Sequence, residues 1–147
     1  MTQYFYVDSC IWLNLFKKEG DPTKGVPYWK IAEDFIERVM FSENEEIIYS
    51  ELVLKEIKFN LNNENLFREK LLFLKREQKF KFVEVVEEDK ISARKLESKS
   101  NFEVSFYDCL HIAMCKRLNF ILVTRDNLLI DFAKDYIEIK KPENLLN

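Results

Sequence analysis

Residues 120–126 read Phe-Ile-Leu-Val-Thr-Arg-Asp, an apolar run that ends in polar residues. Residues 4–8 have the same form, Tyr-Phe-Tyr-Val-Asp. Short, continuous apolar runs are typical of strands buried on both faces, as in a parallel sheet. We therefore expect both runs to be strands of one buried sheet, each followed by an aspartate.

The rest of the chain alternates between helical and strand patterns. Expected helices cover residues 11–18, 28–41, 51–61, 66–78, 88–98, 105–118 and 127–134, and further strands cover 46–49, 80–86 and 136–139. Glu19–Pro27, with both glycines and two of the three prolines, is the clear loop. This order predicts an α/β fold, a three-layer α/β/α sandwich with a central, mostly parallel sheet.

Length and composition exclude several classes of protein. The 147 residues, 47% of them hydrophobic, fit a single domain over 1–147 with one core. Because 23 basic residues oppose 26 acidic ones, bulk positive charge does not hold this protein on nucleic acid, although an acidic nuclease pocket remains compatible. His111 is the sole histidine, which excludes zinc sites built on two or three histidines.

The cysteines and the hydropathy indicate the compartment. Cys10, Cys109 and Cys115 are odd in number, lack CxxC spacing and lie in apolar surroundings. They are typical of small core residues in a reducing cytoplasm. No run approaches the ~20 apolar residues of a membrane span, and residues 1–9 lack the basic start of a signal peptide. We expect a soluble, cytoplasmic protein without a membrane partner.

Four acidic residues stand where a carboxylate needs an explanation. Asp8 and Asp126 follow the two apolar strands, at the edge where parallel α/β sheets bind their ligands. Glu56 points into the apolar arc of its helix, whereas Glu51 points away. Asp108 lies in the first turn of a helix that is apolar nearly all round. Burial of an unpaired carboxylate costs roughly several kcal/mol. A shared functional site would explain why the chain keeps carboxylates at these positions.

Each of the four also has a purely structural interpretation. Asp8 and Asp126 are good helix N-caps, Glu56 suits the edge of a core, and Asp108 complements a helix dipole. If they converge, like charges ~4 Å apart repel by ~4 kcal/mol at an effective dielectric near 20. Such a pocket requires protons or divalent cations, and oxygen ligands suit Mg²⁺ or Mn²⁺.

The chemistry that such a pocket supports is phosphodiester hydrolysis, in which metal ions activate a water and stabilise the leaving oxygen. The hydroxyl of Thr124 could orient Asp126 or the attacking water, or Thr124 could be an ordinary β-branched strand residue. Arg125 is the candidate for a phosphate contact, with a surface salt bridge as the alternative. For His111, one turn after Asp108, we favour a packed, hydrogen-bonded side chain over a member of the site.

Residues 75–82 interleave four basic residues with two phenylalanines, a pattern that single-stranded RNA could contact. We favour the simpler interpretation, a solvated helix end that leads into a core strand.

Four ordered segments resemble the PIN-domain family, particularly the small VapC-type toxins of prokaryotic toxin–antitoxin systems. The segments are Tyr6–Ser9, Ser50–Ile57, Ser105–Ala113 and Leu122–Asp126. Their order and spacing match over essentially the whole chain.

The resemblance implies a Mg²⁺- or Mn²⁺-dependent ribonuclease that forms a homodimer and is inhibited by a protein antitoxin covering its acidic groove. It assigns catalysis and metal binding to the acidic residues Asp8, Glu56, Asp108 and Asp126. The hydroxyls of Ser9 and Thr124 match hydroxyls of the family pattern. Two departures are Cys10, where a small polar residue is common, and the longer loop Glu19–Pro27.

The leading hypothesis is therefore an endoribonuclease that is the toxin of a type II toxin–antitoxin pair. The alternatives are a PIN nuclease of RNA processing and a catalytically silent PIN-like interaction module. A phosphatase of the haloacid-dehalogenase kind would need a second acid two residues after Asp8, where Cys10 stands.

Overall fold

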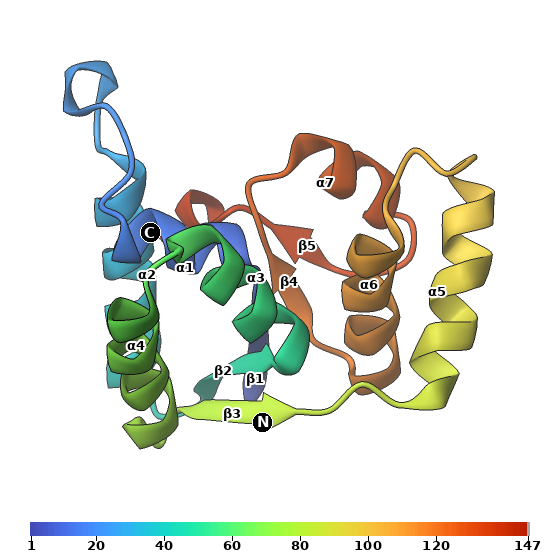
Figure 1. The fold of residues 1–147 in the computed structure, drawn as a ribbon, viewed down its shortest axis with the longest axis horizontal. Helices are drawn as coiled ribbons and strands as arrows, with labels where there is room; N and C mark the ends of the chain where they lie inside the picture. The colour runs from blue at the N-terminus through green and yellow to red at the C-terminus, as the bar shows by residue number, and fades with distance from the viewer. Residues whose placement is uncertain (147) are drawn as a thin grey trace.

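A five-stranded sheet forms the centre of the computed structural model, which describes residues 1–146 (Figure 1). Every neighbouring pair of strands is parallel, and their order is β3-β2-β1-β4-β5. The strands are β1 (Gln3–Val7), β2 (Glu45–Ser50), β3 (Phe80–Val83), β4 (Ile121–Val123) and β5 (Ile139–Lys140).

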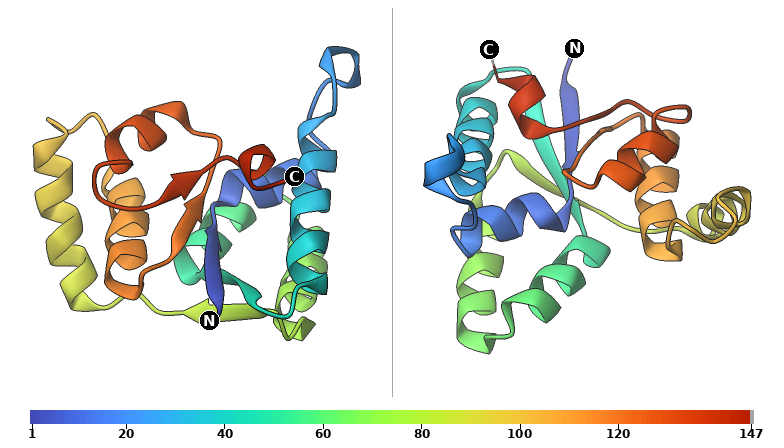
Figure 2. Two further views of the ribbon diagram at one scale, coloured as in Figure 1. Left: turned by 180° about the vertical axis from the view of Figure 1, so that it is seen from behind. Right: turned by 90° about the horizontal axis from the view of Figure 1, so that it is seen from above.

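Helices cover both faces of this sheet (Figures 1 and 2). On one side lie α1 (Ser9–Phe16), α2 (Tyr28–Phe41), α3 (Glu51–Leu61) and α4 (Glu64–Arg76). On the other side lie α5 (Glu87–Lys99), α6 (Phe106–Leu118) and α7 (Asn127–Ala133). The predicted three-layer α/β/α architecture is thus confirmed. Within residues 1–146, no helix combines the length and the apolar character needed to cross a membrane.

The two apolar runs that define the centre of the fold are adjacent strands. Tyr6 of β1 is in register with Leu122 of β4, and Val7 with Val123. Phe5, Tyr6 and Val7 are at most 1% exposed, because helices pack on both faces of β1. Burial on both faces explains why these runs lack the alternation of a half-exposed strand.

The bounds of several elements differ from those predicted, each for a local reason. Helix α1 begins at Ser9, two residues early, because the Asp8 carboxylate accepts the Ser9 N–H and caps the helix. Helix α4 begins at Glu64 because Asn63 caps it. Strand β3 ends at Val83, which is in register with Ser50, the last residue of the neighbouring strand β2. The last strand is displaced to Ile139–Lys140, because the turn that follows α7 includes Tyr136.

The predicted loop at 19–27 is present and holds a single 3₁₀ turn, Pro22–Lys24, which projects beyond α2 (Figure 1). Gly20 has a φ of +130°, and a Cβ there would lie 2.5 Å from the backbone nitrogen of Tyr28. The close approach of the loop to the start of α2 therefore requires glycine at this position.

Candidate metal centre and active site

The carboxyl ends of β1 and β4 form the point where the chain reverses its direction across the sheet. From β1 the chain proceeds to β2 on one side, whereas β4 is followed by β5 on the other. Ligands of open α/β sheets bind at such a switch point. Asp8 lies there, and its backbone N–H donates to the carbonyl oxygen of Val123 at 2.9 Å.

Both oxygens of the Asp8 carboxylate are held in place. Oδ1 accepts a hydrogen bond from the backbone N–H of Ser9 at 2.8 Å, and Oδ2 accepts one from the Thr124 hydroxyl at 2.8 Å. Asp8 is 6% exposed, and Thr124 is fully buried. Asp8 therefore caps α1 and also presents a fixed carboxylate at the switch point, so the two interpretations of Asp8 are compatible.

Thr124 differs in one respect from the role suggested by its spacing. Its hydroxyl donates to Asp8 and accepts the backbone N–H of Asp126 at 3.2 Å. The carboxylate that it orients is that of Asp8, which lies 116 positions away in the chain.

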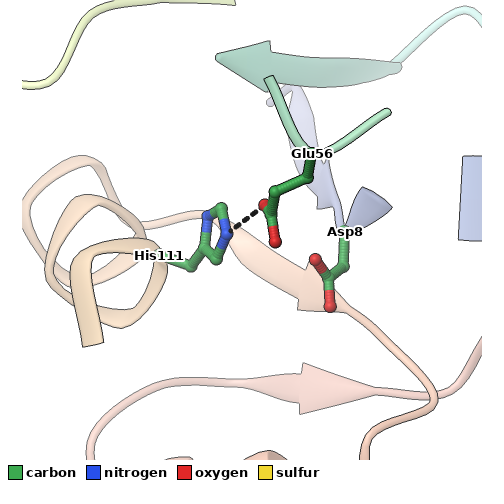
Figure 3. A group of neighbouring side chains, drawn as sticks. All are labelled: Asp8, Glu56 and His111. Carbon is green, nitrogen blue, oxygen red and sulfur yellow. Dashed lines mark hydrogen bonds and ion pairs between the residues drawn. The ribbon is translucent and has the colours of Figure 1, made fainter. Parts of the chain in front are cut away.

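Glu56 approaches Asp8 from α3. A carboxylate oxygen of each residue and a ring nitrogen of His111 all lie within 4.8 Å of one another (Figure 3). Two carboxylates at that distance repel by roughly 3 kcal/mol at an effective dielectric near 20. The Glu56 side chain is 35% exposed, whereas Glu51 of the same helix is 65% exposed and faces away, as the helical spacing predicts.

His111 is fully buried in α6 and both of its ring nitrogens are hydrogen-bonded. Nε2 lies 2.9 Å from Oε1 of Glu56, and Nδ1 lies 2.7 Å from the hydroxyl of Tyr6. Burial lowers the pKa of His111, but the bond to Glu56 and the charges of Asp8, Glu56 and Asp108 outweigh it, so the pKa is raised overall. His111 is thus the packed, hydrogen-bonded histidine favoured from the sequence, and it also contacts the site.

Asp108 stands at the start of α6, in the same electrostatic field. Burial raises the pKa of its carboxyl to about 6, and the charge of Asp8 is the next contribution in the same direction. His111 lowers that pKa, while the charges of Asp126 and Glu56 raise it further. The pKa of Asp108 therefore responds to each of the other three predicted acids.

Asp126 is at the exposed rim. Its carboxylate accepts the N–H of Leu129 at 3.2 Å and caps α7. Neither Asp126 nor Asp108 is among the three residues whose ligand atoms lie within 4.8 Å of one another, which are Asp8, Glu56 and His111.

Arg125 has partners within the protein. Its Nε donates to Oδ1 of Asn14 at 3.1 Å, its Nη1 donates to Glu143 at 2.9 Å, and its guanidinium stacks 4.1 Å from the centroid of Tyr28. The side chain is 13% exposed. The third nitrogen, Nη2, is buried and has no hydrogen-bond partner within residues 1–146. A contact between Arg125 and a substrate phosphate stays a prediction.

Cys10 is the departure from the family pattern that lies closest to Asp8. Its Sγ is 3.6 Å from Oδ2 of Asp8 and 3.5 Å from the Thr124 hydroxyl. Burial, followed by the charge of Asp8, raises the pKa of this thiol to about 12. Cys10 is therefore a neutral thiol and a weak hydrogen-bond donor to Asp8, while Cys109 and Cys115 are buried in the core.

The donor set fits a hard divalent cation. The carboxylates of Asp8 and Glu56 converge there, and burial, followed by the charge of Asp8, raises the pKa of the nearby Asp108 carboxyl. Mg²⁺ and Mn²⁺ prefer such ligands.

Two residues next to this group were not identified from the sequence as part of it. The Tyr6 hydroxyl, besides contacting His111, lies 2.6 Å from Oγ of Ser50. Tyr6 could have been found because residues two apart on a strand share a face, which places it beside Asp8. Ser50 is also the N-cap of α3, where its hydroxyl accepts the Val53 N–H at 3.3 Å.

Comparisons with known proteins agree with this geometry. The PIN domain model matches residues 5–135. No curated protein matches the sequence significantly.

Several solved structures share the fold at low sequence identity. A VapBC2 complex from Rickettsia felis, bound to a promoter DNA fragment, contains a chain with TM-score 0.69 and 16% identity, over 95% of this chain and 98% of that one. The VapC20 toxin of Mycobacterium tuberculosis, described as cleaving the sarcin-ricin loop, gives 0.66 and 17%, over 90% and 95%. VapBC-1 of Haemophilus influenzae gives 0.64 and 18%, over 96% and 99%.

Proposed function

Because the chain belongs to the PIN-domain family, we propose that it is a divalent-metal-dependent endoribonuclease and the toxin of a toxin–antitoxin pair. The observation that carries the proposal is the convergence of Asp8 and Glu56, from β1 and α3, within 4.8 Å at the switch point of the sheet. Hydrogen bonds from Ser9, Thr124 and His111 hold these carboxylates in place, and a divalent cation would neutralise the repulsion between them.

In this proposal the metal is held by the carboxylates of Asp8, Glu56, Asp108 and Asp126. Bound Mg²⁺ or Mn²⁺ would supply Lewis acidity for a water and for a phosphate oxygen. The chain prepares the site through Thr124 and the N–H of Ser9, which fix the two oxygens of Asp8. With a pKa of about 6, Asp108 is mostly ionised at pH 7 and is available as a ligand.

RNA as the substrate and an antitoxin as the partner are supported by the structural relatives. VapC20 is described as cleaving the sarcin-ricin loop, and the Rickettsia felis and Haemophilus influenzae proteins are complexes of the VapBC type. We propose a protein antitoxin over the acidic groove and a homodimer as the assembly, with the cytoplasm as the compartment.

Cleavage of a fluorogenic single-stranded RNA tests the nuclease proposal. With Mn²⁺ present we expect cleavage that EDTA abolishes and that Asp8→Asn lacks, while a DNA of the same sequence stays intact. Cleavage that persists in EDTA would contradict the mechanism, and equal cleavage of DNA would contradict the substrate.

Two alternatives predict different results. A silent PIN-like module would cleave nothing, and its Mn²⁺ affinity, measured by calorimetry, would be the same in wild type and Asp8→Asn. A PIN nuclease of RNA processing would cleave RNA, but no small antitoxin-like reading frame would lie beside its gene and its expression would not arrest growth.

A further inference from the structure

A chain of hydrogen bonds runs from the protein core to Glu56. It starts at Ser50 and passes through the hydroxyl of Tyr6 to His111, whose Nε2 lies 2.9 Å from Oε1 of Glu56. We propose that His111, held by Tyr6 and Ser50, is a positioning residue that fixes the Glu56 carboxylate for metal binding. The inference rests on the proposed function, since it assigns a role at the same site.

The chemistry of the partners sets the direction of the last bond. An ionised carboxylate only accepts hydrogen bonds, so Nε2 of His111 must carry a hydrogen and donate it to Glu56. In a neutral ring Nδ1 accepts from the Tyr6 hydroxyl, and in a charged ring it donates to the Tyr6 oxygen, so Nε2 donates to Glu56 in both states. Ser50 accepts the N–H of Val53, and its hydroxyl can donate to the Tyr6 oxygen or accept from it. The Tyr6 and Ser50 hydroxyls therefore satisfy Nδ1 in either state of the ring.

The members of the chain are rigid where Glu56 is not. Tyr6, Ser50 and His111 are fully buried, and they are anchored on β1, at the end of β2 and in α6. The Glu56 side chain is 35% exposed on a helix surface, where a glutamate has several accessible rotamers. One bond to a fixed ring therefore removes much of that freedom.

The bond also selects which oxygen of Glu56 remains available. In Figure 3 one carboxylate oxygen is bonded to His111, and the other lies on the side of Asp8. Without a donor on α6, repulsion from Asp8 would favour rotamers that carry the Glu56 carboxylate into solvent. Because Nε2 carries the hydrogen, that nitrogen has no lone pair for a cation, so His111 acts through Glu56 and not as a ligand.

The first test compares two tyrosines by calorimetric titration with Mn²⁺. Tyr6→Phe removes the hydroxyl that holds Nδ1 of His111. Tyr49→Phe is the matched control, because Tyr49 is 4% exposed, lies on β2, and makes no side-chain hydrogen bond within residues 1–146. We expect Tyr6→Phe to weaken Mn²⁺ binding about 3- to 10-fold, below the 10- to 100-fold of groups that touch a ligand directly. Tyr49→Phe should bind as wild type does.

The second test asks whether the effect passes through Glu56. In a Glu56→Gln background, Tyr6→Phe should cause no further loss of Mn²⁺ affinity, because the carboxylate that the chain positions is gone. If Tyr6→Phe lowers the Mn²⁺ affinity of Glu56→Gln as much as it lowers that of the wild type, the proposal is wrong. A general loosening of the core would lower the melting temperature in both backgrounds and would not show this dependence.

The third test replaces the ring. His111→Leu should weaken Mn²⁺ binding about 10- to 100-fold. His111→Gln, whose side-chain amide can place an N–H near the position of Nε2, should recover part of that loss. Circular dichroism checks that both variants fold. If His111→Leu does not fold, the result for Tyr6→Phe decides whether the positioning role holds.

The outcomes separate this inference from the proposed function. If wild type fails to bind Mn²⁺, the metal-dependent function is wrong and so is the inference built on it. If wild type binds Mn²⁺ and Tyr6→Phe binds as tightly as Tyr49→Phe, the function stands and the positioning role is wrong.

Discussion

In two places in this protein, acidic side chains bring their ligand atoms within 4.8 Å of one another, yet the two groups differ in origin. Asp8 and Glu56, with His111, place ligand atoms within 4.8 Å of one another, and so do Glu33, Asp34 and Glu37. The first group is gathered from the end of β1, from α3 and from α6, whereas the second belongs to α2 alone. The lesson is that proximity of carboxylates does not by itself make a site.

Surroundings separate the two groups. The α2 acids face solvent in part, which screens their charges. Lys30 of the same helix also lies 3.2 Å from Glu33 and 2.9 Å from Asp34 and pairs with both. At the switch point, burial and neighbouring carboxylates raise the pKa of Asp108 to about 6. In contrast to α2, the switch point holds like charges together where burial limits their solvation, so a cation gains more electrostatic stabilisation there.

The largest expected effect comes from removing one charge from the switch point. Asp8→Asn keeps the shape and the capping ability of the side chain, but it should weaken Mn²⁺ binding by about 100-fold or more, since a ligand charge is lost. Calorimetric titration measures this. Glu37→Gln, the same chemical change in the α2 group, is the control, and equal losses in both variants would remove the distinction between the groups.

Asp89 is a buried acid that is paired with Arg117, so it tests whether metal binding depends on the burial of an acid or on the convergence of several acids. Asp89 is 1% exposed, and its carboxylate accepts from Nε and Nη2 of Arg117 at 2.8 and 2.9 Å. Asp89→Asn should lower the free energy of unfolding by about 1–3 kcal/mol, because Arg117 loses its charged partner. Urea denaturation measures this.

Mn²⁺ affinity should not change in Asp89→Asn, because the charge of Asp89 is already neutralised by Arg117. A loss comparable with that of Asp8→Asn would show that burial of an acid anywhere in the protein matters as much as convergence.

The pH dependence of Mn²⁺ binding tests the electrostatics of the pocket. The folded pKa of Asp108, about 6, is above the ~3.9 of an unfolded chain. Below pH 6 a proton must leave Asp108 before the metal binds, so affinity should fall about tenfold per pH unit for this group. Titrations between pH 5 and 8 measure the slope, and Asp108→Asn should flatten it.

The same shift has a consequence for the metal-free protein. Between about pH 4 and 6 the folded protein keeps a proton on Asp108 that the unfolded chain has lost. Protonation of Asp108 therefore stabilises the fold fully below about pH 4, and this stabilisation is lost as the pH rises through about 6. The difference in stability between wild type and Asp108→Asn should therefore change in that window and be constant above it. A constant difference throughout would contradict a raised pKa.

The smallest effect is expected on α2. Asp34→Asn removes one partner of Lys30 on a solvent-exposed helix face, and such pairs contribute less than about 1 kcal/mol. Urea denaturation should show a change of at most ~0.5 kcal/mol, and Mn²⁺ affinity should not change. A larger change would mean that the α2 group is more than a solvated face.

Much of the fold could be predicted because its signals are local. The apolar runs at 4–8 and 120–126 specify buried strands, and the helical spacing around Glu56 shows which way that side chain points. Element ends were less predictable, since β3 stops where β2 stops and not where its own residues change character. Strand ends depend on a partner, which periodicity does not describe.

The sequence by itself determined the α/β alternation, the strand ends that carry Asp8 and Asp126, and the acids that needed an explanation. Tertiary structure alone decided which groups meet. It pairs Thr124 with Asp8 across 116 positions and His111 with Glu56 across 55, and it places Arg125 against Asn14 and Glu143. The physical reason is that helix spacing and capping act within a few residues, whereas hydrogen bonds between distant side chains depend on how whole elements pack.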